Sequence, residues 1–343
     1  MIPVIDSAPL FGPKCPARDT VDEAILVAAK ANGFMTMVHL PPEVPITAPE
    51  IERLLRIFAL PGAAARRLWR QKFAPAHGNV YRGWFPLQNG HPTYKEGYDL
   101  GPDIAYGPGR VNSADPLCEA TPLPPADLLP GWIDEAARYY KAMERVGAAL
   151  LRAVARALEL PENIFAPAFR NGTSTLRFLH YPIRPPESFQ GVNAAEIWTE
   201  HGGERVDLVG KPHVDSGFVT LLCQHGIPGL QALDREGNWR DVPPAPDSLV
   251  VNFGKLLERW TGGRIRATEH RVIGSGTRTA GRGRYSVPFF YEPAVDAVIA
   301  PIPALGAPGF EPFLYGDLVW AAMMKFVEFE GLDHLRPQRP RIG

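Results

Sequence analysis

The chain has 343 residues, a net charge of −1 and 45% apolar residues, a composition that supports a large buried core and excludes a mainly disordered chain. The near-neutral charge lacks the basic domain that nucleic-acid binders usually carry, so no nucleic-acid partner is expected. No apolar run of about 18 residues or more is present, so no membrane span is expected.

The first half of the chain predicts strands alternating with helices. Residues 2–6 (IPVID) and 34–40 (FMTMVHL) have the apolar, β-branched character of strands. Between them, apolar residues recur at helical spacing over 19–31, and a glycine follows as a stop signal. This alternation predicts a mixed α/β N-terminal region.

Two further helices are predicted before residue 160. Thr47 followed by Glu50 three residues later predicts a capping box at the start of the first. The longest periodic stretch, 132–158, has an apolar stripe on one face and predicts a long helix that serves as a structural spine.

Beyond Pro161 the sequence changes to short β-prone runs bounded by Gly, Pro and Asp, a spacing that predicts an antiparallel sandwich or barrel. These runs cover 174–182, 217–224, 229–234, 247–254, 267–274 and 284–293. A last helix is predicted over 317–328. We predict a mainly β fold with flanking helices, in which residues 1–160 pack on a β core formed by 161–343 as one structural unit.

A pair of metal-ligand side chains lies at the head of the predicted strand 210–222 (GKPHVDSGFVTLL). His213 and Asp215 are two residues apart, so a strand would place them on one face. His270, separated from Asp215 by 54 residues, lies in another β-prone run. Two histidines and one carboxylate on one face of an octahedron leave three positions open, the arrangement of non-haem Fe(II) oxygenases.

The same residues also permit an incidental explanation. A His-x-Asp pair alone usually has no metal role, and the chain has nine histidines from which a third ligand could be drawn. His201 and His225 lie in loop-like contexts flanked by glycine, and His180 is out of phase with Tyr181 on its strand. The metal interpretation therefore depends on further features.

A candidate carboxylate receptor follows the second histidine. Arg284 comes 14 residues after His270, and Ser286 shares a strand face with it about 7 Å along the chain. A guanidinium fork with a hydroxyl suits a carboxylate, although an exposed strand arginine is the alternative. The glycine-rich stretch 274–283 is predicted to be a flexible turn that lets the two strands pair, not a dinucleotide loop.

With these residues in this order, the sequence resembles the 2-oxoglutarate- and Fe(II)-dependent dioxygenase superfamily, and more narrowly its isopenicillin N synthase-like branch. The stretches 176–182 (LRFLHYP), 213–224 (HVDSGFVTLLCQ), 229–272 and 284–293 (RYSVPFFYEP) carry the resemblance. Further matches in the first half, such as YRGWFPL and KEGYDLGPD, extend it over most of the chain.

The resemblance implies a double-stranded β-helix, or jelly-roll, with helices outside. It implies an oxidoreductase that uses Fe(II), O2 and 2-oxoglutarate to oxidise, most simply to hydroxylate, a small molecule, with succinate and CO2 as co-products. The implied iron ligands are His213, Asp215 and His270. The implied 2-oxoglutarate residues are Arg284, Ser286 and Tyr181.

The sequence departs from the family pattern in three places. Residues 252–255 read NFGK where the family has an acid at the last position, which we expect to affect a turn and not the chemistry. Leu179 stands where the family often has a polar side chain, so one contact to the co-substrate is expected to be absent. The stretch 183–211 is longer than the family pattern, and we expect a hairpin or flap over the active-site mouth, or a surface excursion without a role.

Four further residues are candidates for substrate binding. Arg177 shares strand parity with Tyr181, so it is predicted to meet an anionic group on the substrate or on 2-oxoglutarate, unless a neighbouring carboxylate already pairs with it. Phe218 and Phe290 are predicted to form an apolar wall, unless both belong to the core. Arg82 lies in a loop that approaches the site in the family.

Two rival functions remain open on the sequence: an Fe(II) oxidase of the same fold that does not use 2-oxoglutarate, and a non-catalytic jelly-roll binding protein. The substrate, the choice between hydroxylation, desaturation and ring closure, and the oligomeric state are not fixed by the sequence. Three distant cysteines and an N-terminus unlike a signal peptide favour free thiols in the cytoplasm.

Overall fold

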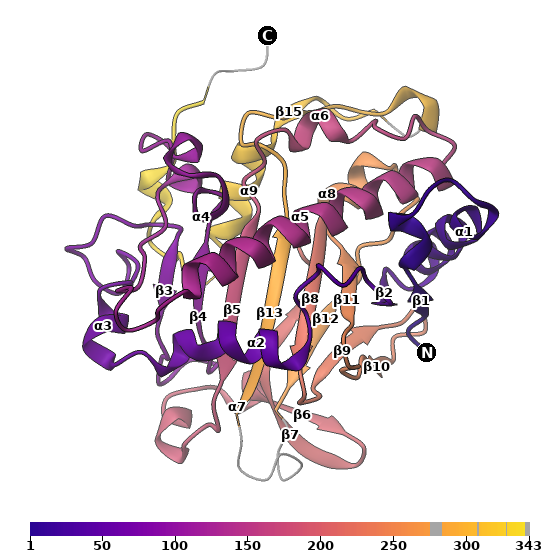
Figure 1. Ribbon diagram of the computed structural model, residues 1–343. Coiled ribbons are helices and arrows are strands. Elements are labelled where there is room, and N and C mark those ends of the chain that lie inside the picture. Colours follow the sequence, from indigo (N-terminus) through magenta and orange to yellow (C-terminus); the bar gives the residue numbers. More distant parts are fainter. Residues whose placement is uncertain (275–282, 307–308, 327, 340–343) are drawn as a thin grey trace.

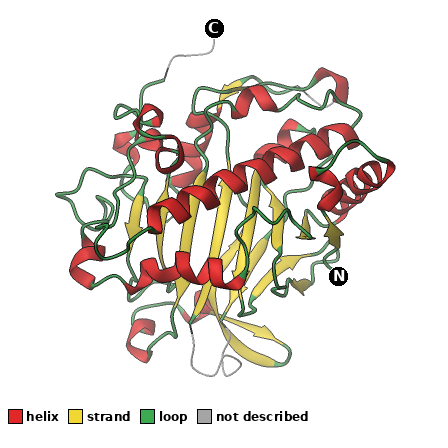
Figure 2. Cartoon of the chain, in the orientation of Figure 1, coloured by secondary structure: helices red, strands yellow, loops and turns green. Residues whose placement is uncertain are grey.

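A computed structural model describes residues 1–274, 283–306, 309–326 and 328–339. The described chain is mainly β with flanking helices, as predicted (Figures 1 and 2). Its strands form two large sheets, and helices cover the outer face of the larger one.

Within the described residues, the larger sheet has eight strands in the order β1-β2-β11-β8-β13-β5-β4-β3. Four of them come from the first 100 residues, so the N-terminal region extends the same sheet that the later strands form. The strands are β1 (Val4–Asp6), β2 (Phe34–Val38), β3 (Gly83–Phe85), β4 (Glu96–Leu100), β5 (Thr175–Tyr181), β8 (Val219–His225), β11 (Leu249–Phe253) and β13 (Arg284–Tyr291).

The second sheet has five strands among the described residues, in the order β10-β9-β12-β7-β6. They are β6 (Trp198–His201), β7 (Glu204–His213), β9 (Leu230–Leu233), β10 (Trp239–Asp241) and β12 (His270–Ile273); a separate pair joins β14 (Val298–Ile299) to β15 (Phe313–Leu314). The predicted pairing of the strands on either side of 274–283 is wrong. Strand β12 pairs with β7 and β9, whereas β13 pairs with β5 and β8, so the two strands belong to different sheets.

The helices are α1 (Pro16–Ala31), α2 (Ala48–Leu55), α3 (Gly62–Arg66), α4 (Asp103–Tyr106), α5 (Trp132–Ala157), α6 (Ala166–Phe169), α7 (Ala194–Ile197), α8 (Lys255–Trp260) and α9 (Tyr315–Met323). The predicted capping box is present at α2, where Glu50 accepts hydrogen bonds from the backbone and hydroxyl of Thr47. Helix α1 begins three residues earlier than predicted, since Pro16 suits a first helical position. Helix α9 ends five residues earlier than predicted. Among the described residues no helix has the length and apolar character to cross a bilayer.

Apolar side chains pack against both faces of the larger sheet. Strand β5 contributes to both, because its successive side chains point to opposite faces. Phe178 packs against Trp132 of α5, the long helix that crosses the outer face in Figure 1. Leu179 and Tyr181 belong to a second apolar cluster that also contains Val209 and Val272 from the five-stranded sheet. Side chains on this inner face therefore point into the space between the two sheets, where the candidate site lies.

Candidate metal centre and active site

His213 and Asp215 are brought together by a chain reversal and not by one strand. His213 is the last residue of β7, and Asp215 lies in the turn before β8, so the prediction of a single strand over 210–222 is wrong. The turn is tight: a Cβ at Gly217 would lie 1.9 Å from a carboxylate oxygen of Glu292. A larger residue at position 217 would have to displace the buried Glu292 carboxylate.

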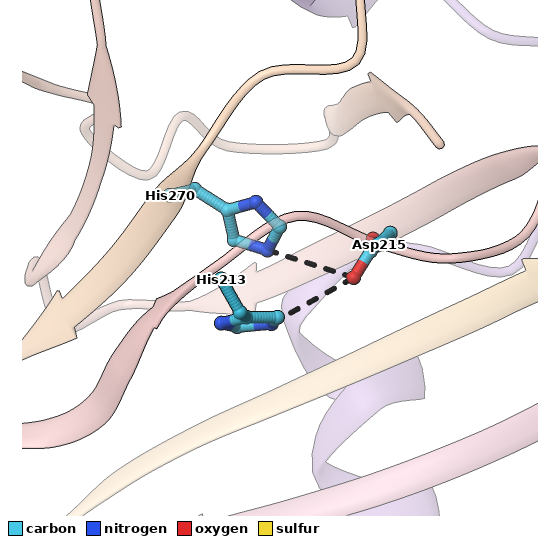
Figure 3. Close-up of side chains that lie close together, drawn as sticks. All are labelled: His213, Asp215 and His270. Atoms are coloured by element: carbon cyan, nitrogen blue, oxygen red, sulfur yellow. Dashed lines mark ion pairs between the residues drawn. The ribbon is translucent and has the colours of Figure 1, made fainter. Parts of the chain in front are cut away.

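His270 joins the pair from β12, where it lies in register with His213 of β7. The Nε2 atoms of His213 and His270 lie 3.7 and 3.8 Å from the same oxygen, Oδ1 of Asp215 (Figure 3). The three ligand atoms lie within 4.8 Å of one another. Two imidazole nitrogens and a carboxylate oxygen thus converge on one point that a single cation could occupy.

Hydrogen bonds fix which nitrogen of each imidazole faces that point. His213 Nδ1 lies 2.7 Å from the carbonyl oxygen of Lys211, and His270 Nδ1 lies 3.3 Å from that of Thr268. A carbonyl can only accept, so each Nδ1 carries the proton and each Nε2 keeps its lone pair. This is the second-layer arrangement that orients metal-ligating histidines.

The carboxylate of Asp215 is oriented in the same way. Its Oδ2 accepts hydrogen bonds from the Thr220 hydroxyl at 2.5 Å and the Asn252 amide at 2.7 Å, which leaves Oδ1 for the shared point. Burial alone would raise the pKa of Asp215, but the two histidines and these hydrogen bonds hold it below its ordinary value. Burial and the neighbouring His270 lower the pKa of His213 to about 4, so His213 is neutral, as a ligand must be.

The NFGK stretch supports the turn that carries Asp215. The Lys255 N–H donates to the carbonyl of Asp215 at 2.8 Å, and the Gly254 N–H donates to that of Phe218 at 2.9 Å. The Lys255 side chain itself is exposed. The backbone of this stretch, together with Asn252, therefore positions the carboxylate.

Arg284 and Tyr181 lie opposite each other on β13 and β5, at one end of the inner face. Arg284 is 4% exposed; its Nη2 donates to Gln224 at 3.2 Å, while Nε and Nη1 are buried without a hydrogen-bond partner among the described residues. Burial lowers the pKa of this guanidinium. Ser286 is buried on the same strand face. Two unsatisfied donors on a guanidinium that borders a cavity can bind an anion.

A cavity of about 320 Å³ adjoins Arg284, and we call it the Arg284 cavity. The long stretch 183–211 forms one wall, through a short helix and the hairpin of β6 and β7, and contributes Ile183, Arg184, Phe189, Trp198, Arg205, Val206, Asp207 and Val209. The predicted hairpin is therefore present, but most of it lies at this cavity. The glycine-rich turn predicted at 274–283 falls largely on 275–282, outside the described residues.

A second cavity of about 420 Å³ reaches the metal-ligand cluster, and we call it the metal cavity. His213 and Asp215 line it together with Arg177 and Phe290. The long stretch reaches it only through residues 210–211, where that stretch ends. The sequence did not predict its other wall, which includes Val319 and Met323 of α9 and Phe326 and Phe329 after it, because no motif marks this part of the chain.

Arg177 lines the metal cavity but is also paired with a carboxylate, the alternative that the sequence left open. Its Nε and Nη2 donate to the two oxygens of Asp99 at 2.6 and 2.7 Å. The guanidinium lies between the rings of Phe85 and Phe290, 5.4 and 5.3 Å from their centroids. Phe290 thus reaches both the cavity and the arginine.

The structure places the other two substrate candidates away from the metal cavity. Arg82 is fully buried and donates to the Thr175 hydroxyl and to backbone carbonyls, so its guanidinium ties loops together. Phe218 is 1% exposed and packs edge-on against Phe169 and Trp260, so it belongs to the core. Neither side chain lines the metal cavity, so the structure gives no support for these two substrate contacts.

Comparison with known proteins places this geometry in context. Residues 187–293 match the family model of the 2OG-Fe(II) oxygenase superfamily. The 2-oxoglutarate-Fe(II) type oxidoreductase hxnY of Emericella nidulans is 29% identical over 93% of this chain and 88% of its own. The proline hydroxylase buaE of Petromyces alliaceus is 31% identical over 69% of this chain and 71% of its own.

A solved structure shows the same fold. A full-length Neurospora crassa protein, crystallised in complex with alpha-KG and thymine, superposes with a TM-score of 0.78 at 23% identity, over 95% of this chain and 97% of that one. The two sheets described above are thus those of a jelly-roll with helices outside, as predicted.

Proposed function

The chain belongs to the 2OG-Fe(II) oxygenase superfamily and is an oxidoreductase that uses Fe(II), 2-oxoglutarate and O2, and we propose that it hydroxylates a C–H bond of a small organic substrate in the metal cavity. Isopenicillin N synthase of Streptomyces clavuligerus is also a relative, in line with the predicted branch. The observation that carries the proposal is the convergence of His213, Asp215 and His270 on one point.

These three residues are the proposed iron ligands. Two imidazoles and one carboxylate are the donor set of a facial triad, and each is already oriented by a hydrogen bond on its other atom. When bound, the iron supplies the oxidising power, while the protein supplies geometry and a water-poor cavity.

Arg284, Ser286 and Tyr181 are the proposed binding residues for the distal carboxylate of 2-oxoglutarate. The support is the pair of unpartnered nitrogens on Arg284, because a buried cation with unsatisfied donors is costly until an anion fills the space. Ser286 adds a hydroxyl on the same strand face, and Tyr181 lies under the guanidinium, 5.1 Å from ring centroid to Cζ. Leu179, in register with Ser286, adds only an apolar contact.

Arg177 and Phe290 are the proposed substrate contacts, since both line the metal cavity. The cavity is large enough for a small molecule and too small for a folded macromolecule or a duplex. The proposal includes a location in the reducing cytoplasm, supported by three free cysteines.

The test is an anaerobic titration of the purified protein with Fe(II) and 2-oxoglutarate. A weak visible charge-transfer band is expected, and it is expected to be lost in Asp215→Ala and in Arg284→Gln. Admission of air is expected to release succinate, at a rate that rises with the true substrate.

Each rival function gives a different result. An oxidase that does not use 2-oxoglutarate would bind Fe(II) without the band and would consume O2 without succinate. A binding protein would give neither the band nor O2 consumption. Either result would replace the proposal.

A further inference from the structure

Arg177 belongs to a buried cluster of charges whose members do not cancel. Asp99 is bridged by two arginines, Arg70 and Arg177; the Asp99 and Arg70 side chains are 0% exposed, and that of Arg177 is 14% exposed. One carboxylate between two guanidinium groups leaves one positive charge in excess.

A neighbouring charged pair on this side of the cavity does not remove the excess. Lys95 lies 3.2 Å from Glu328, and the two charges balance each other. In these ion pairs three cations, Arg70, Arg177 and Lys95, face two carboxylates, which leaves one positive charge in excess. Glu292 also lines the cavity; burial raises its pKa to about 8, and its carboxylate accepts a hydrogen bond from the Tyr315 hydroxyl.

The free edge of Arg177 brings this excess charge to the metal cavity. The two faces of its guanidinium are covered by Phe85 and Phe290, and the edge formed by Nε and Nη2 is held by Asp99. Nη1 makes no hydrogen bond to any other residue in the described part of the chain. Arg70 sits behind, fully buried, and does not line the cavity.

We propose that the substrate is a small carboxylate whose anionic group binds the free edge of Arg177 and whose apolar body lies along Phe290, Phe326 and Phe329. An uncompensated buried charge is unfavourable, and a ligand of opposite charge relieves it. Guanidinium groups bind carboxylates through charge-assisted hydrogen bonds, and aromatic walls accept a flat or aliphatic body. The substrate class rests on the proposed function, because it places the C–H bond to be oxidised beside the iron ligands.

Arg284 is not a competing explanation for this anion. It lies on the inner face six residues from Phe290 along β13, which is about 20 Å in a strand. The two arginines also border different cavities. An anion bound at Arg284 therefore does not neutralise the positive charge at Arg177.

The experiment uses the holoprotein with Fe(II) and saturating 2-oxoglutarate under anaerobic conditions. Benzoate and phenylacetate are titrated beside their neutral amides, benzamide and phenylacetamide. Binding is followed by the shift in the visible band and by the rise in Tm. Each acid is expected to bind about 10-fold or more tightly than its amide, as hydrogen bonds to a charged group imply.

Arg177→Gln is expected to abolish this preference for the acids, and Arg177→Lys to weaken it. The glutamine variant should fold, since it leaves Arg70 and Asp99 as a balanced pair. Arg145→Gln, a change of the same kind at a residue with a 60% exposed side chain, is expected to keep the preference.

Equal binding of acids and amides by the wild-type protein, or no binding of either, would overturn the substrate class. Retention of the preference in Arg177→Gln would overturn the assignment to Arg177. Neither result touches the proposed oxygenase function, which fails only if the visible band with Fe(II) and 2-oxoglutarate is missing.

Discussion

Arg284 and Arg177 come from neighbouring strands of one sheet and share its inner face, yet their surroundings differ. Arg284 has no carboxylate partner among the described residues, and two of its nitrogens are unsatisfied. Arg177 is held on one edge by Asp99 and on both faces by aromatic rings. The difference teaches that residue type does not fix the role of a buried arginine; the number of its donors already in use does.

The comparison also divides the site into two ends. At the Arg284 end the structure offers two unpaired guanidinium nitrogens to an anion, which suits the carboxylate of a compact dianion. At the Arg177 end it offers a single edge beside aromatic rings, which suits an anion attached to an apolar body. The metal-ligand cluster borders the second end directly.

The largest expected effect comes from Arg284→Gln, which removes the guanidinium with two unpaired nitrogens. We expect the affinity for 2-oxoglutarate to fall by about 2–5 kcal/mol, or at least about 30-fold, as for other buried charged partners. The visible band as a function of 2-oxoglutarate concentration measures this loss. Arg177→Gln is expected to leave this affinity within about 3-fold, and an equal loss in both variants would erase the distinction between the two ends.

A buried carboxylate at the Arg177 end makes the stability of the fold depend on pH. Although burial opposes ionisation, Lys95 and the two arginines lower the pKa of Glu328 to about 2. A lowered pKa stabilises the fold above the ordinary value of 4.5, and this stability is lost as the pH falls toward 2. The shift corresponds to about 3 kcal/mol.

Glu328→Gln tests this dependence in the metal-free protein. The variant is expected to be about 3 kcal/mol less stable than the wild type near neutral pH, by urea unfolding, and to approach the wild type below about pH 3. A difference that stays constant with pH would mean that the carboxylate acts by packing and not by charge.

Asn252→Ala tests the metal site that lies between the two ends, because Asn252 orients the proposed iron ligand Asp215. Loss of its hydrogen bond to Asp215 should weaken Fe(II) binding about 10- to 100-fold, as for other residues that orient metal ligands. Competition with a colorimetric chelator measures the affinity. Ser248→Ala, a buried control with a hydroxyl bonded only to the Ala245 carbonyl, should leave it unchanged; weakening in both variants would point to general loosening of the sheet.

The smallest expected effect comes from Trp198→Ala in the hairpin. Trp198 stacks on Phe189 and lies under Arg205 at the Arg284 cavity. We expect the KM for 2-oxoglutarate to rise about 2- to 5-fold, in line with an exposed cation–π contact. Benzoate binding should not change, and a change there would mean that the hairpin serves the metal cavity instead.

The sequence predicted most strands and the long helix because period and turn residues are local signals. It also identified the residues that converge on the metal point, through their order along the chain. It placed His213 and Asp215 on one strand because nothing local distinguishes a tight reversal at Gly217 from a strand that continues. Asp99 as the partner of Arg177 could not be predicted, since 78 residues separate them and only the pairing of β4 with β5 brings them together.

The same limit explains why two substrate candidates do not line the metal cavity. Arg82 and Phe218 lie close in sequence to functional residues, but the burial of a side chain depends on the whole fold. The segment after α9 was missed for a related reason: its phenylalanines form part of a cavity wall only after the chain has folded back on the sheets.

The proposed iron ligands and the proposed co-substrate arginine belong to different sheets. His213 and His270 lie on the five-stranded sheet, and Arg284 lies on the eight-stranded one. A dicarboxylate that reaches from the metal to Arg284 would connect the two sheets for as long as it is bound. Bound 2-oxoglutarate would then stabilise the packing of the two sheets, so that the protein resists unfolding most strongly when iron and co-substrate are bound.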